Sequence, residues 1–293
     1  MEPVNFPQQT PLYYALHAER YQRRELIRQV QALTGRKLMV YFTNAMRPDS
    51  AIDQRDVVPF QEMIYDCLNH SESDVDLLIQ SSGGDIDAAE KIVSLIRGQV
   101  ASLRVIVSER AKSAATLIAL AADEILMSDT SELGPIDPQV VVQTATGQPV
   151  MRPAQSFLDG LKRILQETQQ AGVLNPAYYP ILSHLDPALI DFCEKAIARS
   201  KQFARRWLEQ HMCAGDVQKA ESIARQLCDV ERYASHGAVI NYEEAQAMGL
   251  KVNYVRTNEP LWEAIWRLHT AYEVFIHRTQ LPKVFETEHV SIA

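Results

Sequence analysis

The pattern of apolar and polar residues is most regular between residues 75 and 139, where short apolar runs alternate with turns and helix-like segments. The apolar runs are Val75–Ile79, Leu103–Val107 and Glu124–Met127. The first run leads through a Gly-Gly turn into a predicted helix, Asp85–Arg97, and the second leads into a helix of small residues that begins at Ser113. Repeated strand–turn–helix units predict a parallel sheet with crossover helices. The strand ends of such a sheet are where α/β proteins place their chemistry.

The flanking segments add helices and a few strands to this centre. Before it, the pattern predicts a disordered start over residues 1–10, a helix over Leu12–Leu33, a strand over Leu38–Phe42 and a helix over Val57–Asn69. After it, the pattern predicts a hairpin over Val140–Met151, helices over Pro153–Gln170, Pro187–Gln210, Ala214–Gln226, Tyr242–Met248 and Pro260–Ile276, a strand over Val252–Val255 and a loose tail over Lys283–Ala293. The class is therefore α/β, with a helical block after the sheet.

Composition and charge exclude several classes of function. The 293 residues are 46% hydrophobic and carry a formal charge of −8, which argues against a nucleic-acid surface built on phosphate contacts. The polar N-terminus has no signal-peptide pattern, and the longest apolar run, Ala114–Ala122, is too short to span a bilayer. We therefore expect a cytoplasmic protein that binds no nucleic acid and has no membrane span.

The cysteines and histidines do not form a recognisable metal motif. Four cysteines show no CxxC pairing, so free thiols in a reducing compartment are expected. His211, Cys213, Cys228 and His236 have side chains that zinc accepts, but the short paired spacing of a structural zinc site is missing. We expect neither a metal nor a cofactor.

The stretch around Ser113 has the parts of an acyl-transfer site. A serine at a helix start lies beside outward-pointing backbone amides and the positive end of the helix dipole. The Gly83-Gly84 turn allows bare amides to approach a ligand. An amide from Gly84 or Asp85 and the amide of Ala114 would form an oxyanion hole. By local spacing alone, a tight turn and a capping serine explain the same residues.

A family resemblance favours the catalytic interpretation. The strings SSGGD, AKSAATLIALAADEI and LGPIDPQ, together with the opening PLYYALHAERYQRRELIRQVQALTGRKLMVYF and the later SHGAVINYEEAQAMGLKV, resemble the Clp-protease/crotonase superfamily. More closely they resemble the serine dehydrogenase proteinases, relatives of signal peptide peptidase A. The resemblance covers most of residues 11–255. It implies a Clp/crotonase-like fold with stacked ββα units and a serine nucleophile at Ser113, with Gly83 and Gly84 in the oxyanion turn.

The general base is open between three residues. The Clp type uses Ser-His-Asp, but the segment where its histidine would fall, LGPIDPQ, contains Asp137 and no histidine. Lys162 lies in a region comparable to that of the lysine in the Ser-Lys peptidases, and a desolvated lysine can act as base. His236 lies near where the Clp type places its aspartate, and Asp137 could orient it. We prefer Lys162 by a small margin, then His236, and rank Lys112 third because neighbours at a helix start point apart.

Each of these candidates also has a structural explanation. Lys162 is followed by Arg163 and could be a solvated helix lysine, and His236 could be a capping or core histidine. Lys162 and His236, as general base, predict different dependences of activity on pH. A lysine base gives activity that rises into the alkaline range, and a histidine base gives a rise near neutral pH that levels off.

The whole chain is expected to be a serine peptidase acting on peptide or protein substrates. We expect one Clp/crotonase-like hydrolase domain over residues 11–256, with a helical insertion at about 153–228, and a C-terminal helix and tail over 257–293. The helical block after Pro153 and the aromatic stripe of Pro260–Ile276 predict a homo-oligomer, because a bare aromatic stripe would leave a large apolar patch. The alternatives are a crotonase-like acyl-thioester enzyme, for which no basic cluster suits a nucleotide, and a catalytically idle assembly or adaptor subunit that keeps the fold.

Overall fold

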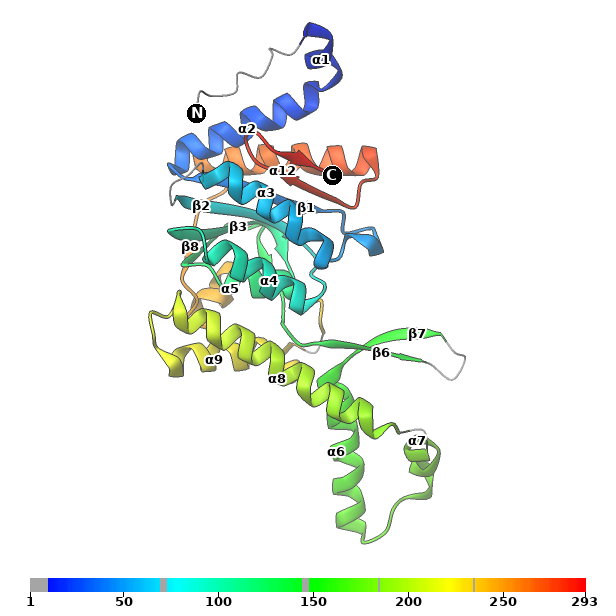
Figure 1. Cartoon of the computed structure of the whole chain (residues 1–293). Coiled ribbons are helices and arrows are strands. Elements are labelled where there is room, and N and C mark those ends of the chain that lie inside the picture. Colours follow the sequence, from blue (N-terminus) through cyan, green and yellow to red (C-terminus); the bar gives the residue numbers. More distant parts are fainter. Residues whose placement is uncertain (1–9, 69–72, 144–147, 184, 234) are drawn as a thin grey trace.

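A single mixed sheet forms the centre of the molecule (Figure 1). The computed structural model describes residues 10–68, 73–143, 148–183, 185–233 and 235–293. The sheet has eight strands, seven of them in the order β10-β9-β1-β2-β3-β4-β8, and β5 pairs with β3. The parallel strands are β1 Lys37–Thr43, β2 Asp74–Ser81, β3 Ser102–Ala111, β4 Glu124–Met127, β5 Glu132–Leu133 and β8 Val252–Tyr254. The predicted α/β class with a mostly parallel sheet is confirmed.

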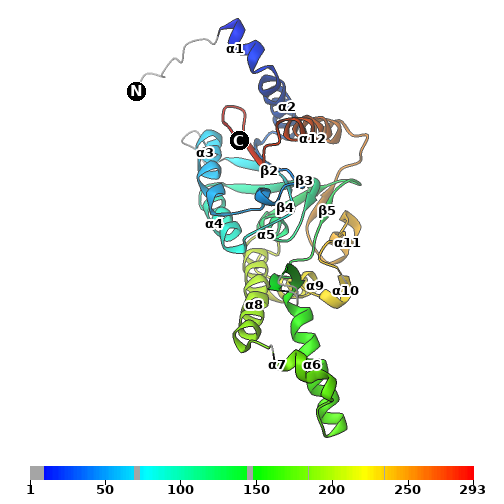
Figure 2. The same cartoon turned by 90° about the vertical axis from the view of Figure 1, so that its right-hand side faces the viewer.

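Helices cover both faces of this sheet, as the two views show (Figures 1 and 2). One face packs against α3 Val57–Leu68, α4 Ile86–Arg97 and α5 Ala114–Leu120, and the other packs against α2 Ala18–Thr34 and α12 Pro260–Thr279. Alternate residues of β1 point to opposite faces, so Met39 and Tyr41 join the first cluster while Leu38 and Val40 join the second. A strand buried on both faces is apolar throughout, which is why these runs were recognisable in the sequence.

The N-terminal helix predicted over Leu12–Leu33 is divided in two. The chain forms α1 Pro11–Leu16 and α2, with a break at His17, whose φ of −112° and ψ of 22° are not helical. The helix α2 buries Ile27 and Val30 against the sheet, whereas α1 buries none of its residues. The prediction of one continuous helix was therefore wrong, because only α2 has a sheet face to follow.

The C-terminal segment predicted to be loose is part of the sheet. Strands β9 Lys283–Glu286 and β10 Ser291–Ile292 extend it, and β9 pairs antiparallel with β1. Their charges are neutralised inside the molecule: Glu286 pairs with Arg23 at 2.6 Å, and Lys283 pairs with Asp56 at 2.6 Å. The prediction was wrong because a short run bounded by charges resembles a surface tail until its partners are known.

The aromatic helix predicted as a subunit contact is also internal. In α12, Trp262, Ile265, Leu268 and Tyr272 are buried against the sheet and α2. This stripe therefore gives no reason for self-association, and that part of the prediction is corrected.

A hairpin and several helices follow the central sheet. The hairpin consists of β6 Gln139–Gln143 and β7 Pro149–Pro153, as predicted, although Gly147 of its expected tip lies outside the described residues. The helices are α6 Ala154–Ala171, α7 Tyr179–Ser183, α8 Pro187–Gln210, α9 Val217–Leu227, α10 Val230–Tyr233 and α11 Tyr242–Ala247. Short 3-10 turns occur at Pro48–Ser50, Gln54–Asp56 and Pro176–Tyr178.

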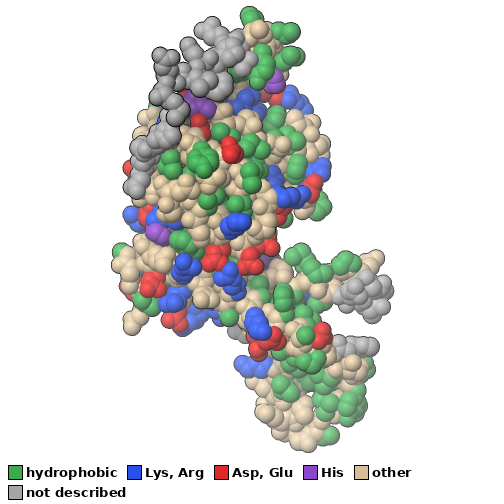
Figure 3. Space-filling model, in the orientation of Figure 1, with side chains coloured by type: hydrophobic (Ala, Val, Ile, Leu, Met, Phe, Trp, Pro, Cys, Tyr) green, Lys and Arg blue, Asp and Glu red, His purple; other side chains and the backbone are tan. Residues whose placement is uncertain are grey.

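Part of this block projects away from the rest of the molecule (Figures 1 and 3). We call residues 139–198, which comprise the hairpin, α6, α7 and the first half of α8, the arm, and the remaining described residues the body. The second half of α8 returns to the body, where Phe203 and Leu208 are buried. None of the helices in the described part of the chain is long and apolar enough to cross a membrane.

Candidate active site

Ser113 lies in a tight turn between the carboxyl end of β3 and the start of α5. Its φ of 51° and ψ of −118° fall outside the regions that ordinary residues occupy. A backbone conformation of this kind costs about 1–3 kcal/mol and persists only where the surrounding structure enforces it. Nucleophilic serines of hydrolases are found in such strained strand-to-helix turns, which present the hydroxyl at the sheet edge.

Hydrogen bonds on both sides of Ser113 hold this turn. The amide of Lys112 donates to the carbonyl of Ser81 on the neighbouring strand at 3.0 Å. The hydroxyl of Thr116, one turn further on, donates to the carbonyl of Ala111 at 2.6 Å and also accepts from the amide of Gly134 at 3.1 Å. These bonds hold the backbone on both sides of Ser113. They therefore help to keep the residue in its strained conformation.

The Gly83-Gly84 turn packs directly against Ser113. Gly83 has a φ of 98°, and a Cβ added there would lie 2.6 Å from the carbonyl oxygen of Lys112 and 2.8 Å from Cβ of Ser113. Gly84 has a φ of 155°, and a Cβ there would overlap the backbone of Ile52. Only glycine fits at either position. The turn and the serine, 29 residues apart in sequence (113 − 84), therefore form one site.

The backbone amides of this turn are not all available. The amide of Gly83 donates to the hydroxyl of Ser81 at 3.1 Å, and the amide of Asp85 donates to the carbonyl of Ile52 at 2.8 Å. Asp85 itself caps α4, with its carboxylate accepting from the amide of Ala88. The amide of Asp85 is therefore already bonded, and of the two alternatives Gly84 is the better placed to act as an oxyanion donor.

Two amides remain for an oxyanion. Within the described ranges, the amides of Gly84 and Ala114 have no hydrogen-bond acceptor. Both residues line the cavity that also contains Ser113. Free amides beside a strained serine are suited to stabilise negative charge on a tetrahedral intermediate.

His236 and Asp137 come together beside the same cavity. Nδ1 of His236 lies 2.8 Å from a carboxylate oxygen of Asp137, across 99 residues of sequence. The side chain of Asp137 is only 4% exposed and also accepts a hydrogen bond from the side-chain Nε2 of Gln139 at 2.8 Å. The side chain of His236 is 29% exposed and lines the cavity with Ser113. A carboxylate at Nδ1 fixes the tautomer that leaves Nε2 free to accept a proton.

Lys162, the preferred base from the sequence, lies elsewhere. It is an exposed residue of α6 in the arm, and it does not line the cavity. Its resemblance to the lysine of the Ser-Lys peptidases was judged by position along the chain, and α6 projects away from α5, at whose start Ser113 lies (Figure 1). The geometry therefore does not support Lys162 as base.

The rival serines have other environments. Ser108 is completely buried, and its hydroxyl lies 3.0 Å from Nδ1 of the buried His269. Ser81 is buried, and its hydroxyl accepts from Gly83. Ser82 is exposed in the Gly-Gly turn and lines the cavity, but its backbone φ is not among the positive values that mark Ser113.

The cavity has a volume of about 530 Å³ and is bounded by both parts of the molecule. The body provides Ser113, the glycine turn, His236 and a loop with Arg47, and the arm provides Gln139, Met151, Phe192 and Ala196. Leu117 and Ile136 add apolar surface next to Ala114. A cleft of this kind accommodates an extended chain with apolar and polar groups.

The four residues considered for zinc do not converge. His211 bonds to Arg97, His236 bonds to Asp137, and burial raises the pKa of the Cys228 thiol to about 12. No group of three or more His, Cys, Asp or Glu side chains arranged to hold a metal ion occurs among the residues that the structure describes.

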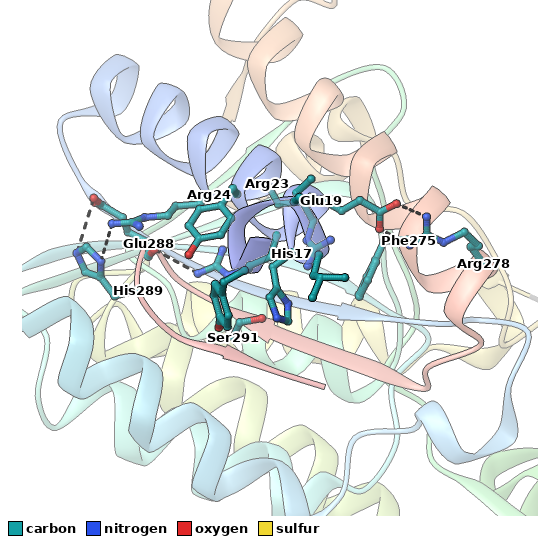
Figure 4. Close-up of a pocket in the computed structure, with 15 residues that line it drawn as sticks. His17, Glu19, Arg23, Arg24, Phe275, Arg278, Glu288, His289 and Ser291 are labelled. Atoms are coloured by element: carbon teal, nitrogen blue, oxygen red, sulfur yellow. Dashed lines mark hydrogen bonds and ion pairs between the residues drawn. The ribbon is translucent and has the colours of Figure 1, made fainter. Parts of the chain in front are cut away.

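A larger pocket of about 830 Å³ lies between the N-terminal helices, α12 and the C-terminal strands (Figure 4). It shares no residue with the cavity at Ser113. Ion pairs within it or at its wall join Arg278 to Glu19, and Arg23 to Glu286 at 2.6 Å. No strained serine lies among the residues that line it.

Comparison with known proteins gives a family match over the centre of the chain. The model of the ClpP-like SDH-type serine proteinases matches residues 62–167, a segment that contains the glycine turn, Ser113 and Asp137. Two uncharacterized proteins of Methanocaldococcus jannaschii are 32% identical over 199 residues and 30% identical over 193 residues, which are 68% and 66% of this chain. The matched segments span 58% and 56% of these relatives.

Several solved structures of ClpP-like proteases are also similar. The membrane-bound stomatin-specific protease 1510-N is 17% identical, with 73% of this chain and 79% of that chain covered and a TM-score of 0.44. ClpP1 from Listeria monocytogenes is 12% identical, with 82% and 99% covered and a TM-score of 0.44. The ClpP catalytic domain from Plasmodium falciparum is 11% identical, with 88% and 97% covered and a TM-score of 0.41. At these TM-scores the neighbours provide no site geometry for this chain.

Proposed function

We propose, from the membership of residues 62–167 in the ClpP-like SDH-type serine proteinases, that this protein is a serine peptidase that cleaves peptide bonds through Ser113. The family match supports a serine peptidase at the level of the family. The observation that carries the residue assignment is the cavity shared by the strained Ser113, Gly84, Ala114 and His236, whose ring is paired with Asp137.

In the proposed reaction, Nε2 of His236 accepts the proton of the Ser113 hydroxyl while Oγ attacks the carbonyl carbon of the peptide. The amides of Gly84 and Ala114 donate to the oxyanion that forms. Collapse breaks the C–N bond, and His236 gives its proton to the leaving amine, which leaves an ester on Ser113. Water then attacks that ester with His236 again as base, which releases the acid and restores the serine. Asp137 orients the ring and stabilises its protonated form throughout.

This assignment places the two acid–base residues in exchanged order along the chain. Asp137 occupies the segment where the resemblance to the Clp type led us to look for a histidine, and His236 occupies the segment of the aspartate. Because such constellations are defined by geometry and not by sequence order, the exchange is chemically neutral. A histidine that is paired with a carboxylate and lines the cavity of Ser113 also weighs against a catalytically idle subunit.

We further propose that the protein self-associates through the arm. The arm exposes large apolar side chains that its own small cluster does not cover, namely Val141, Met151, Leu165, Val173, Tyr179, Ile181 and Phe192. Figure 3 shows apolar side chains gathered over this part of the molecule. A second copy of the same surface would bury them symmetrically.

Labelling with a fluorophosphonate, which forms a covalent bond with an activated serine, tests the peptidase proposal. The wild-type protein should carry the label on Ser113 in a peptide map. Ser113→Ala should lose the label, whereas Ser82→Ala, a change to the other serine of the cavity, should keep it. Absence of label from the wild-type protein, or persistence in Ser113→Ala, would overturn the assignment.

A further inference from the structure

Lys112 precedes the proposed nucleophile, and its ammonium group makes three polar contacts. Nζ donates to the carbonyl of Ala238 at 2.9 Å and to the carbonyl of Leu133 at 3.1 Å. It also lies 3.0 Å from a carboxylate oxygen of Glu132. An ammonium group has three N–H donors, so these contacts use its full capacity.

The three contacts join three separate segments of the chain. Lys112 belongs to the turn that holds Ser113, Leu133 belongs to β5, and Ala238 lies two residues after His236. The bond to Ala238 spans 126 residues. It is therefore a direct link between the strand end that carries the serine and the loop that carries the histidine.

Gly134 leaves space for the side chain of Lys112. A Cβ added to Gly134 would lie 2.6 Å from Cδ of Lys112, so only glycine leaves room for it at this position. The lysine side chain is only 12% exposed and does not line the cavity. Burial lowers the pKa of Lys112, and the Glu132 carboxylate opposes that effect by favouring the charged form. The ammonium therefore serves as an internal tether, away from substrate.

We propose that Lys112 is a positioning residue that holds the His236 loop against the Ser113 turn. Its catalytic consequence rests on the proposed function, because it requires His236 to be the base. The mechanical consequence does not: without the ammonium, the loop at Ala238 loses its bond to the turn of Ser113. A base displaced by about 1 Å lowers the rate up to about a hundredfold, because the reacting atoms no longer align.

Lys112→Met tests the tether, because methionine keeps the length and removes the donors. We expect kcat for a peptide substrate to fall about tenfold to a hundredfold with KM within about twofold. In hydrogen-exchange mass spectrometry, the segment 235–241 should exchange about tenfold faster, as expected for the loss of hydrogen bonds to a charged group.

Arg97→Met is the matched control. It also removes a part-buried cation, which bonds to Asp123 at 2.8 Å near the amino-terminal ends of β3 and β4, away from the end of β3 that leads to Ser113. We expect it to leave both the exchange of segment 235–241 and kcat close to the wild-type values. Equal effects of the two variants on that segment would show a general loss of stability and overturn the tether.

Gly134→Ala provides a second route if Lys112→Met does not fold. The added methyl group displaces the lysine chain without removing it, so the same loss of kcat and the same faster exchange are expected. Lys112→Arg, which keeps a charged donor, should recover part of kcat. Unchanged exchange of segment 235–241 in both Lys112→Met and Gly134→Ala would refute the tether whether or not the protein is a peptidase. Faster exchange together with an inactive wild-type enzyme would refute only the peptidase assignment.

Discussion

The body and the arm differ in how far their apolar side chains are buried. In α5 of the body, all seven residues are buried. Among the described residues of the arm, the hydrophobic cluster has four buried members, Val140, Ala154, Cys193 and Ile197, and large side chains such as Ile181, at 57% exposure, face outward. Apolar burial stabilises a fold by about 25 cal/mol per Å². The body is therefore stabilised by its own buried apolar side chains. The arm has fewer of them, and its stability depends more on contacts with the body or with another molecule.

The body and the arm also contribute different kinds of residue to the cavity. The proposed chemical groups, Ser113, Gly84 and His236, all come from the body, where packing and hydrogen bonds fix their positions. The arm provides side chains such as Met151 and Phe192 that would contact a substrate without taking part in bond breaking. Rigid positioning is needed most where atoms react. Changes in the body should accordingly alter kcat, and changes in the arm should alter KM or assembly.

The largest effect should come from the base. We expect His236→Ala to lower kcat/KM about a hundredfold to ten-thousandfold, because general-base catalysis contributes that much. Lys162→Ala, in the arm, should leave kcat/KM within about twofold. Steady-state kinetics with a fluorogenic peptide measure both. Retained activity in His236→Ala together with loss of activity in Lys162→Ala would show that the general base comes from the arm and not from the body.

A large effect is also expected on assembly. Ile181→Asp places a charge on the exposed surface of α7, and desolvating that charge would oppose burial in an interface. Multi-angle light scattering should then return the 33.1 kDa monomer, whereas the wild-type protein should give a multiple of it. Val58→Asp, at an equally exposed position on α3 of the body, should keep the wild-type mass. A monomeric wild-type protein at micromolar concentration would contradict self-association through the arm.

A moderate effect should follow from the arm side of the cavity. Phe192→Ala removes an aromatic side chain that lines the cleft, and we expect KM to rise about fivefold with kcat unchanged, a loss of about 1 kcal/mol. Tyr65→Ala, an exposed aromatic residue of α3 in the body, should change neither constant. A fall in kcat for Phe192→Ala would show that the arm also positions the reacting groups.

The smallest effect concerns the strain stored at Ser113. Glycine adopts a positive φ without steric cost, so Ser113→Gly should be more stable than Ser113→Ala by about 1 kcal/mol. Urea unfolding followed by circular dichroism can compare the two inactive variants. Equal midpoints would show that the turn is relaxed, and the strain would then no longer distinguish this serine from the others.

The parallel sheet was predictable because its strands carry their own signal. Val75–Ile79 and Leu103–Val107 are apolar apart from Asp76 and Arg104, which pair with each other at 2.7 Å, and each run is followed by a turn. The strand β9 was not predictable, since Lys283 and Glu286 are buried only because Asp56 and Arg23 reach them from distant segments. The same limit applies to α12, whose buried stripe looks identical whether it faces the sheet or another subunit.

The sequence also predicted only part of the candidate site, because contacts between residues far apart in the chain leave no local pattern. Ser113 and the glycine turn were proposed from the sequence because the family resemblance singled them out, whereas local spacing alone also fitted a tight turn and a capping serine. The choice between His236 and Lys162 depended on the path of the chain after Gln139, which no local pattern contains. Lys112 was ranked by its direction relative to Ser113 alone, and its bond to Ala238 has no sequence signal.

The helix α8 connects the two regions as one continuous rod. With a rise of 1.5 Å per residue, its 24 residues span about 36 Å. Its first turns lie in the arm, Phe192, Ala196 and Arg199 line the cavity, and Phe203 is buried in the body. A contact that tilted the outer end of the arm would therefore also move Phe192 and Ala196, and would change the width of the cavity at Ser113.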